Sequence, residues 1–586
     1  MHGGGDSLPL RARGLIGDTA TAALVAADGT IDWWCPGRFD APAALFRLLD
    51  AGGGAVRVAP AGPPIAGDQS YVERTNVLRT VLNAGEAALE VVDLLPWARG
   101  RVDGRIVRII TARRGPVDVT VEVRPGSAFG PARDVTTWSE GIAFDGVAVH
   151  TGAPVDGRVA RFRLDAGERR VVTIEAVDGR PDPLSVDAAL DLLDRTEVAW
   201  RSHLEPLTYD GPYRAAVERS FLVLRALTTS YGSVIAAPTT SLPGRIGGER
   251  NWDHRYSWVR DAALAVDAAY DAGLPEEAER FVEWLAGVCG REEFPLRAAY
   301  RLDGEVLDDA DEREVDLDGW RHSQPVRVGA RTDGDLQLDF YADVVSAVHT
   351  EQVLAGDRRV PAMWPALGGM TDWLSEAWAR PDRGIWEFRS APRQLVFSKL
   401  ASWYVLDRMA RLATARNPLD LSAPLWRVAA NDVAGWLDAH GIAADGGLRQ
   451  DTSSADLVDA ALVQVVWRNP WAPDTRVAER TVDRVIQRLG DGPFVYRYGD
   501  TTDDGLPPGE GAFLACSFWV VEALARLGRW DEAHARMEEL CSFTAPLGLV
   551  PEQADPRTRD FLGNLPQAVA HLALVQAALA LDDGPG

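Results

Sequence analysis

The sequence predicts a multidomain β + α protein, in which an N-terminal antiparallel β-sandwich is followed by an (α/α)6 barrel. The chain has 586 residues, which is more than one ordinary hydrophobic core accommodates, so two domains are expected. In the first third, apolar residues recur with the period of two that strands require; from residue 212 they recur with the 3.6-residue period of helices. We therefore expect a sandwich over residues 1–182, a helical linker over 183–211 and a barrel over 212–586.

The strands of the first domain are predicted from short apolar runs with turn residues between them. TAALVAADGTIDWWC places two such runs around Asp28 and Gly29, a pair typical of hairpin turns. RIVRIITARRGPVDVTVEVRP repeats the pattern around Gly115 and Pro116, and similar runs follow at 141–152 and 158–177. Many short strands separated by turns favour an antiparallel sandwich.

After the linker, the spacing predicts twelve amphipathic helices. Many of them start after Asp, Pro or Gly and stop at Gly, as helix caps require. Twelve helices can close as six inner and six outer ones, leaving a pocket at one end that is lined by the connecting loops. A helical solenoid is the alternative, but the sequence shows no 34–47-residue repeat. The predicted ranges are 212–230, 256–273, 275–288, 334–356, 358–379, 393–415, 423–440, 454–467, 474–490, 512–528, 529–543 and 564–581.

The charge of the chain excludes some classes of partner. The net charge is −25 and the isoelectric point is about 4.8, and such an acidic surface repels nucleic acids and anionic membranes. No apolar run reaches the ~20 residues that span a bilayer. The N-terminal stretch MHGGGDSLPLRARGLIGD lacks the apolar core of a signal peptide. We expect a cytoplasmic protein that binds a small carbohydrate or glycoside; the sequence leaves a homo-oligomer open.

The metal-binding residue types are not grouped. The four cysteines, Cys35, Cys289, Cys516 and Cys541, are far apart in the sequence, and the nine histidines form no HExxH motif. We expect no metal and no cofactor.

Four loops between the predicted helices combine aromatic and charged residues: RNWDHRYSWVRD (250–261), GWRHSQPVRVG (319–329), GIWEFR (384–389) and GLVPEQADP (548–556). Aromatic rings pack against the C–H faces of a sugar, while its hydroxyls need charged or amide partners in fixed directions. The loops therefore indicate a carbohydrate pocket. For any single tryptophan, packing in the core is the competing explanation.

Glycoside hydrolysis needs two carboxyl groups, one protonated and one ionised, on either side of the scissile bond. Aromatic surroundings desolvate a carboxyl group, raise its pKa and keep it protonated near neutral pH. Glu387 stands between Trp386 and Phe388, which fits the general acid, and Glu552 beside Gln553 fits the general base.

Several stretches, in the same order along nearly the whole chain, resemble glycoside hydrolase family 15, the family of glucoamylases and trehalases. They are GLIGDTATAALVAADGTIDWWCPGRFDAPAALF, RNWDHRYSWVRDA, PVRVG, LQLDFYADV, DRGIWEFR, GEGAFLACSFW and LGNLPQAVAHLAL. The resemblance implies a sandwich packed on a catalytic (α/α)6 barrel and an inverting reaction without a cofactor. It assigns Glu387 as the general acid and Glu552 as the general base. It implies a substrate-binding set of Arg260, Asp261, Trp252, His254, Trp258, Trp320, Gln324 and Trp386.

Four positions depart from the pattern of the family. His254 replaces a tyrosine, Gln324 an arginine, Ala330 an asparagine and Phe397 a histidine. We expect these positions near the sugar pocket, where they would alter the substrate more than the class of reaction.

The leading hypothesis is an inverting, exo-acting glycosidase that releases glucose from a short α-glucoside, with weak activity on starch. One alternative is a family-15-like enzyme repurposed for a secondary metabolite, in which the same carboxyl pair cleaves, dehydrates or cyclises it. Another is a non-catalytic carbohydrate-binding protein, which is disfavoured because both carboxylates are present.

Overall fold

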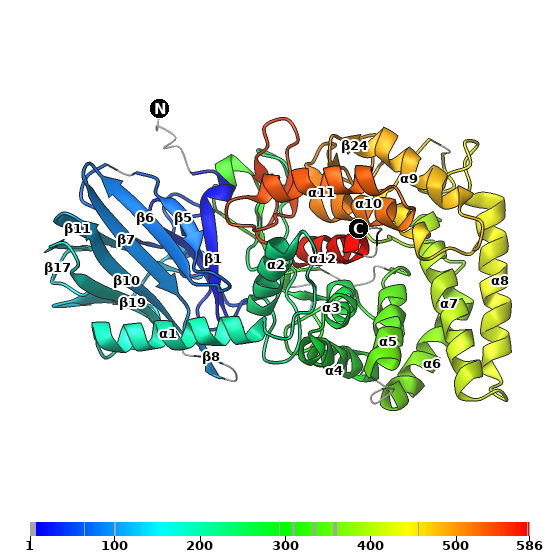
Figure 1. Cartoon of the computed structure of the whole chain (residues 1–586), viewed down its shortest axis with the longest axis horizontal. Helices are drawn as coiled ribbons and strands as arrows, with labels where there is room; N and C mark the ends of the chain where they lie inside the picture. The colour runs from blue at the N-terminus through cyan, green and yellow to red at the C-terminus, as the bar shows by residue number, and fades with distance from the viewer. Residues whose placement is uncertain are drawn as a thin grey trace.

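A computed structural model describes residues 8–63, 65–98, 101–102, 104–291, 294–307, 311–331, 336–355, 360–454, 456–582 and 584. Two β-sheets from the N-terminal part of the chain form one side of the molecule, and helices form the other (Figure 1). The two parts match the predicted fold class, an antiparallel β domain followed by a helical (α/α)6 domain.

The sandwich consists of a seven-stranded and an eight-stranded antiparallel sheet. In spatial order, the first sheet contains β1 (Arg13–Gly17), β2 (Ala22–Ala26), β3 (Thr30–Trp34), β4 (Ala55–Pro60), β11 (Val117–Arg124), β18 (Val159–Leu164) and β17 (Val155–Asp156). The second contains β14 (Val135–Trp138), β15 (Gly141–Phe144), β16 (Val147–His150), β19 (Arg169–Ala176), β10 (Arg105–Arg114), β7 (Ala87–Leu94), β6 (Leu78–Ala84) and β5 (Asp68–Tyr71).

The linker forms helix α1 (Val186–His203), which covers the outer face of the second sheet (Figure 1). Its N-cap is Ser185, whose hydroxyl accepts a hydrogen bond from the backbone N–H of Ala188. Ala189 of the helix packs with Val107 and Ile109 of β10 in a small apolar cluster. Strand β10 is therefore buried on both faces, which explains its continuous apolar run in place of alternation.

The barrel alternates outer and inner elements along the chain. The outer helices are α2 (Arg214–Ala226), α4 (Pro275–Arg291), α6 (Val360–Ala377), α8 (Ser422–His440), α9 (Arg476–Leu489) and α11 (Trp530–Thr544). The inner elements are α3 (Val259–Asp271), α5 (Tyr341–Ala355), α7 (Val396–Arg416), the 3-10 helix η4 (Ala460–Val466), α10 (Leu514–Arg526) and α12 (Ala568–Asp582). Each inner element packs against the next, and α12 packs against α3, so the ring closes.

One predicted helix, 454–467, differs in the structure. Its described residues form the shorter 3-10 helix η4, whose N-cap Asp459 accepts a hydrogen bond from the backbone N–H of Ala461. Ala460 to Val465 are all buried. The apolar run that resembled one face of a long helix is therefore a short element of the inner wall.

The remaining described strands are short pairs and one three-stranded sheet. They are β8 (Trp97–Ala98) with β9 (Arg101–Val102), β12 (Gly126–Ser127) with β13 (Gly130–Pro131), β20 (Ser257–Trp258) with β21 (Ala299–Tyr300), β22 (Arg313–Val315) with β23 (Val326–Val328), β24 (Gly490–Asp491) with β25 (Phe494–Val495), and β26 (Ala512–Phe513) with β27 (Gln553–Ala554) and β28 (Phe561–Leu562). Two further 3-10 turns are η1 (Leu10–Ala12) and η3 (Trp320–His322).

Sandwich and barrel share one continuous hydrophobic core. The indole N–H of Trp33 in β3 donates to the carbonyl of Pro238 at 2.7 Å, and the Asn76 amide donates to the carbonyl of Leu222 in α2 at 2.6 Å. The sandwich is therefore a fixed support for the loops of the barrel.

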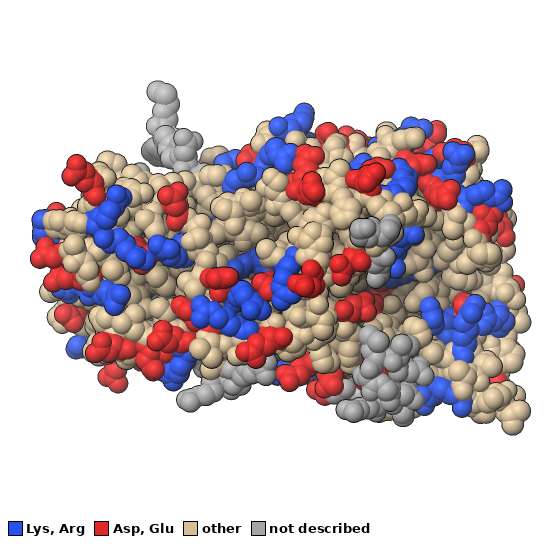
Figure 2. Space-filling view, in the orientation of Figure 1, with Lys and Arg blue, Asp and Glu red and all other residues tan. Residues whose placement is uncertain are grey.

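On the face shown in Figure 2, acidic and basic side chains are interspersed over both domains, although acidic residues outnumber basic ones in the chain, 86 to 61. No described helix is both long and apolar enough to cross a membrane.

Candidate active site

A pocket with a cavity of about 150 Å³ lies where inner elements of the barrel begin. Trp258, Phe513 and Gln567 line it, and each directly precedes an inner helix: α3, α10 and α12, respectively. Helix N-termini carry partial positive charge. The walls of the pocket therefore suit carboxylates and the oxygen atoms of a polar ligand.

The loop that carries Trp252, His254 and Trp258 is tied to the sandwich by Arg255, which is fully buried. The Arg255 guanidinium donates to both carboxylate oxygens of Asp253, at 2.8 and 2.7 Å, and to the carbonyl of Ala41 at 2.7 Å. Because Arg255 and Asp253 neutralise each other, the loop can be buried without an unpaired charge.

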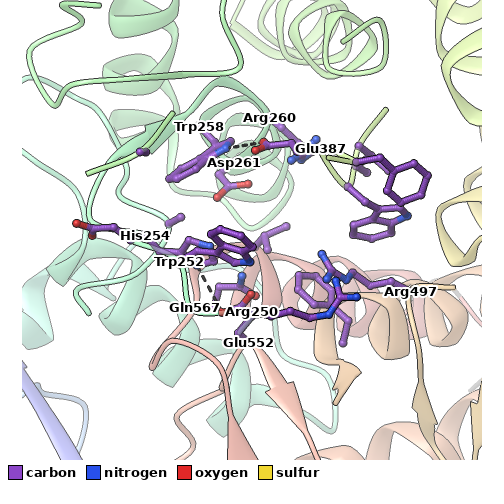
Figure 3. Close-up of a pocket in the computed structure, with 18 of the residues that line it drawn as sticks. Arg250, Trp252, His254, Trp258, Arg260, Asp261, Glu387, Arg497, Glu552 and Gln567 are labelled. Atoms are coloured by element: carbon purple, nitrogen blue, oxygen red, sulfur yellow. Dashed lines mark hydrogen bonds and ion pairs between the residues drawn. The ribbon is translucent and has the colours of Figure 1, made fainter. Parts of the chain in front are cut away.

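Glu387 and Trp258 lie side by side in the pocket, and Figure 3 draws the contact between them as a dashed line. The Trp258 indole N–H donates to Glu387 Oε1 at 2.9 Å. The backbone of Glu387 is left-handed, with φ 55°, a conformation that is uncommon for a non-glycine residue. Its two sequence neighbours turn elsewhere: Trp386 donates to Asp459 at 2.9 Å, and Phe388 packs edge-on against Tyr498.

The loop before Glu387 is held in place by the buried carboxyl group of Asp382. Asp382 accepts hydrogen bonds from the Ser398 hydroxyl at 2.7 Å and from the Gly384 N–H at 3.2 Å. Burial raises the pKa of Asp382 to about 6, against the opposing effect of the nearby Lys399 ammonium. Burial lowers the pKa of Lys399 to about 8, and its ammonium donates to the carbonyl of Arg380 at 2.7 Å.

Glu552 reaches the pocket from the segment before β27 and is 6% exposed. Its Oε2 accepts a hydrogen bond from the backbone N–H of Asn564 at 2.8 Å and lies 3.6 Å from His254 Nδ1. The Asn564 side chain is held by Thr239 and by the carbonyl of Trp252. The hydrogen bond from the Asn564 N–H therefore fixes the orientation of the Glu552 carboxyl group.

Arg260 and Asp261 stand in the first turn of α3 and both line the pocket. The Arg260 guanidinium donates to Asp339 at 3.1 Å. Burial raises the pKa of Asp261 to about 6, while Arg260 and His254 oppose the shift. Asp339 lies behind them, and burial raises its pKa to about 7 against the opposing charge of Arg260.

Trp252 is covered in part by arginines. The guanidinium carbons of Arg389 and Arg327 lie 4.2 and 4.7 Å from the centroid of its ring. Arg389 also donates to Glu312 at 3.3 Å. Since Arg389 is exposed, this cluster lies at the mouth of the pocket, where it adds cation–π contacts and charge.

The structure brings eight of the ten predicted site residues to the pocket. They are Glu387, Glu552, Arg260, Asp261, Trp252, His254, Trp258 and Trp386. Trp320 does not line it: this side chain is buried between the domains, with the Arg13 guanidinium 4.9 Å from its ring centroid. Gln324 is exposed and donates to the carbonyl of Leu317 instead.

Of the four positions that depart from the family pattern, two line the pocket and two do not. His254 and Ala330 line the pocket. Phe397 is buried in the core at the start of α7, and Gln324 lies outside the pocket as described above. Only the first two positions are placed to contact a ligand in this pocket.

The pocket also contains residues that the sequence analysis did not single out. Arg250 forms a buried ion pair with Asp504, which also accepts a hydrogen bond from the Tyr498 hydroxyl at 2.6 Å. Arg497 pairs with Glu510. Arg497 and Asp504 both line the pocket and belong to the segment VYRYGDTTDDG (495–505). This segment has the same mixture of aromatic and charged residues as the four loops named in the sequence analysis.

Gln567 is a further pocket residue outside the predicted set. It is buried, and among the described residues its Oε1 has no hydrogen-bond partner. A buried acceptor without a partner is costly, which fits an atom that a ligand hydroxyl satisfies. Within the described part of the chain, no group of three or more His, Cys, Asp and Glu residues is arranged to hold a metal ion.

Known proteins resemble this chain over most of its length. The profile described as "Glycosyl hydrolases family 15" matches residues 211–538, and "Trehalase-like, N-terminal" matches residues 2–153. A trehalase of Mycolicibacterium smegmatis is 33% identical over 97% of this chain and 91% of its own length. A trehalase of Thermoplasma acidophilum is 32% identical over 96% of this chain and 98% of its own length. A bacterial glucoamylase solved with acarbose has the same fold, with a TM-score of 0.71, 12% identity, and coverage of 100% of this chain and 96% of its own.

Proposed function

Because the chain belongs to glycosyl hydrolase family 15 and is a glycosidase, we propose that it hydrolyses a short α-glucoside, preferably α,α-trehalose, to glucose. The observation that carries the proposal is that Glu387 and Glu552 line one pocket together with Arg260 and Asp261. The names of the relatives support trehalose, since trehalases match over almost the whole of this chain.

In the proposed reaction, Glu387 is the acid. It gives its proton to the glycosidic oxygen, which leaves with the electron pair of the bond to the anomeric carbon. Glu552 removes a proton from a water molecule as the water oxygen forms the new bond on the opposite face of the ring. The anomeric carbon inverts, and exchange of one proton with solvent restores both carboxyl groups.

The contacts of each carboxyl group suit its proposed role. The Trp258 N–H fixes Glu387 through Oε1, so the other oxygen can carry the proton toward the substrate. Glu552 accepts a hydrogen bond from the Asn564 N–H through Oε2, which fixes the orientation of this carboxyl group in the pocket.

The other pocket residues fit the two halves of a short substrate. Arg260, Asp261 and Gln567 supply donors and acceptors for the hydroxyls of the ring that is attacked. The cluster of Arg389, Glu312 and Trp252 stands at the mouth, where a longer chain would have to pass. Ala330 offers neither donor nor acceptor. These features favour a disaccharide over starch.

The test is hydrolysis of trehalose, maltose, isomaltose and maltotriose by the purified protein, with glucose as the measured product. We expect trehalose to be the best substrate. Glu387→Gln and Glu552→Gln should each lower kcat at least a hundredfold, the scale of general acid or base catalysis, while the fold is kept. Glu305→Gln is the control, because Glu305 is an exposed glutamate outside the pocket.

Two results would refute the proposal. One is near-normal turnover by Glu387→Gln or Glu552→Gln. The other is a failure of all four sugars to give glucose, which would favour the alternative of a repurposed enzyme that dehydrates or cyclises another substrate.

A further inference from the structure

We propose that His254 is a positioning residue for Glu552 and that its imidazole sets the pH range in which Glu552 acts as a base. This inference rests on the proposed function, in which Glu552 activates water. The family pattern described in the sequence analysis has a tyrosine at this position, where this chain has His254.

The first observation is the approach of the two side chains. His254 Nδ1 lies 3.6 Å from Glu552 Oε2, and the side chains are 13% and 7% exposed. Nδ1 is buried, and among the described residues it has no hydrogen-bond partner. A shift of about 0.5 Å would bring the two atoms into hydrogen-bond range. Nδ1 of the imidazole therefore faces the carboxylate of Glu552.

The second observation is that the ring is held in place. The carbonyl of His254 accepts a hydrogen bond from the Ala237 N–H at 2.8 Å. The imidazole packs edge-on against Trp258, with ring centroids 5.5 Å apart at 71°. Trp258 in turn donates to Glu387. His254 therefore stands in a continuous line of contacts between the two carboxyl groups (Figure 3).

The third observation concerns the charges around the ring. Arg255 neutralises Asp253 in an ion pair. The charge of Arg260 partly offsets that of its neighbour Asp261. Among the described residues, Glu552 is the carboxylate that lies within 4 Å of Nδ1. The charged groups of this part of the pocket are Glu552 before β27, Asp253 in the same loop, Arg260 and Asp261 in α3, Glu387 in its loop and Arg497 after β25.

The chemical consequence follows from the residue type. A tyrosine hydroxyl is neutral throughout the working range, so it can share a hydrogen bond with a carboxylate but adds no charge. An imidazole becomes cationic near pH 6.5, and a cation beside Glu552 keeps that carboxylate ionised at lower pH. His254 should thus extend the activity of this enzyme toward acid pH, compared with the same enzyme carrying tyrosine.

The experiment compares the pH dependence of kcat/KM on trehalose for the wild type, His254→Phe and His254→Tyr. We expect His254→Phe to lower kcat about ten- to a hundredfold, which is the scale of a polar contact to a charged group, with a smaller change in KM. The acid limb of its profile should move to higher pH by about one unit. His254→Tyr should recover part of kcat, since it restores a donor, but not the position of the acid limb.

A second measurement does not depend on turnover. With ring-labelled histidine, NMR should show the midpoint of the His254 titration moving to lower pH in Glu552→Gln, because the variant removes the carboxylate that stabilises the imidazolium.

Unchanged acid limbs in both His254 variants, or an unchanged titration midpoint in Glu552→Gln, would overturn the inference. A wild type that is inactive on every α-glucoside would refute the proposed function, while the NMR titration would still test the contact itself.

Discussion

At the scale of single residues, the position of Glu387 shows how local sequence and spatial surroundings can differ. Trp386 and Phe388 are its neighbours in the chain, yet they turn toward Asp459 and Tyr498. The ring that contacts the carboxyl group is Trp258, 129 positions earlier. The left-handed backbone of Glu387 separates it from both neighbours. The sequence therefore predicted an aromatic environment correctly but could not tell which ring forms it.

Gly563 is the residue that sets the space available to Glu552. Its φ is +68°, and a Cβ atom there would lie 2.6 Å from Glu552 Cβ and 2.7 Å from Oε2. Gly563→Ala should therefore displace Glu552, lower kcat at least tenfold and reduce the free energy of unfolding by more than the ~1 kcal/mol that a positive φ alone costs. Activity assays and denaturant unfolding measure both effects.

The matched control is Gly492→Ala. Gly492 also has a positive φ, +60°, but a Cβ there would have no atom within 4 Å. This variant should show only the backbone cost and full activity. Equal kcat values for the two variants would mean that Gly563 does not shape the site.

At the scale of elements, eleven of the predicted helical ranges correspond to α-helices among the described residues, and the twelfth corresponds to η4. Periodicity predicts these helices because the outer ones have one apolar face and the inner ones are apolar on most sides. Periodicity does not distinguish a short 3-10 turn of buried residues from a longer helix, which is why 454–467 was wrong in type and length.

The loops are less predictable than the helices. GWRHSQPVRVG has the same composition as the pocket loops, yet Trp320 packs between the domains and Gln324 faces solvent. Conversely, Arg497, Asp504 and Gln567 reach the pocket from segments that are far from Glu387 in the sequence. Their convergence depends on the closure of the helical ring, which composition does not reveal.

The contact between the inner helices α3 and α5 makes stability depend on pH. Asp267 of α3 accepts a hydrogen bond from the Ser346 hydroxyl of α5 at 2.8 Å. Burial raises the pKa of Asp267 from 3.8 to about 7. Between about pH 4 and pH 7, Asp267 keeps its proton in the folded state but releases it in the unfolded chain. The contribution of protonated Asp267 to stability is therefore fully present below about pH 4 and is lost as the pH rises through about 7.

We therefore expect the free energy of unfolding to fall between about pH 4 and pH 7, and to fall less in Asp267→Asn. Asparagine keeps a hydrogen-bonding side chain of the same size without an ionisable group. Urea unfolding at a series of pH values measures the slope, with Asp432→Asn on the exposed face of α8 as the control. Identical slopes in the wild type and Asp267→Asn would contradict this account.

At the scale of the whole molecule, the two-domain organisation explains how the site is positioned. Arg255 ties the loop of His254 and Trp258 to the sandwich. In the barrel, Glu387 lies before α7 and Glu552 lies before β27, so the two carboxyl groups reach the pocket from different parts of the ring. The boundaries at 182 and 212 and the cytoplasmic location stay predictions, and the sequence leaves the oligomeric state open. The fold class and the family were predictable because several motifs occur in the same order over the whole chain.

The central claim is that Glu387 and Glu552 act as an acid and a base on opposite faces of an anomeric carbon. Its most direct test is proton NMR of the glucose formed in the first minutes of trehalose hydrolysis, before the anomers equilibrate. Inversion at one of the two α-linked carbons gives α-glucose and β-glucose in equal amounts, which is the predicted result. The appearance of α-glucose alone would show retention and would contradict the assigned roles.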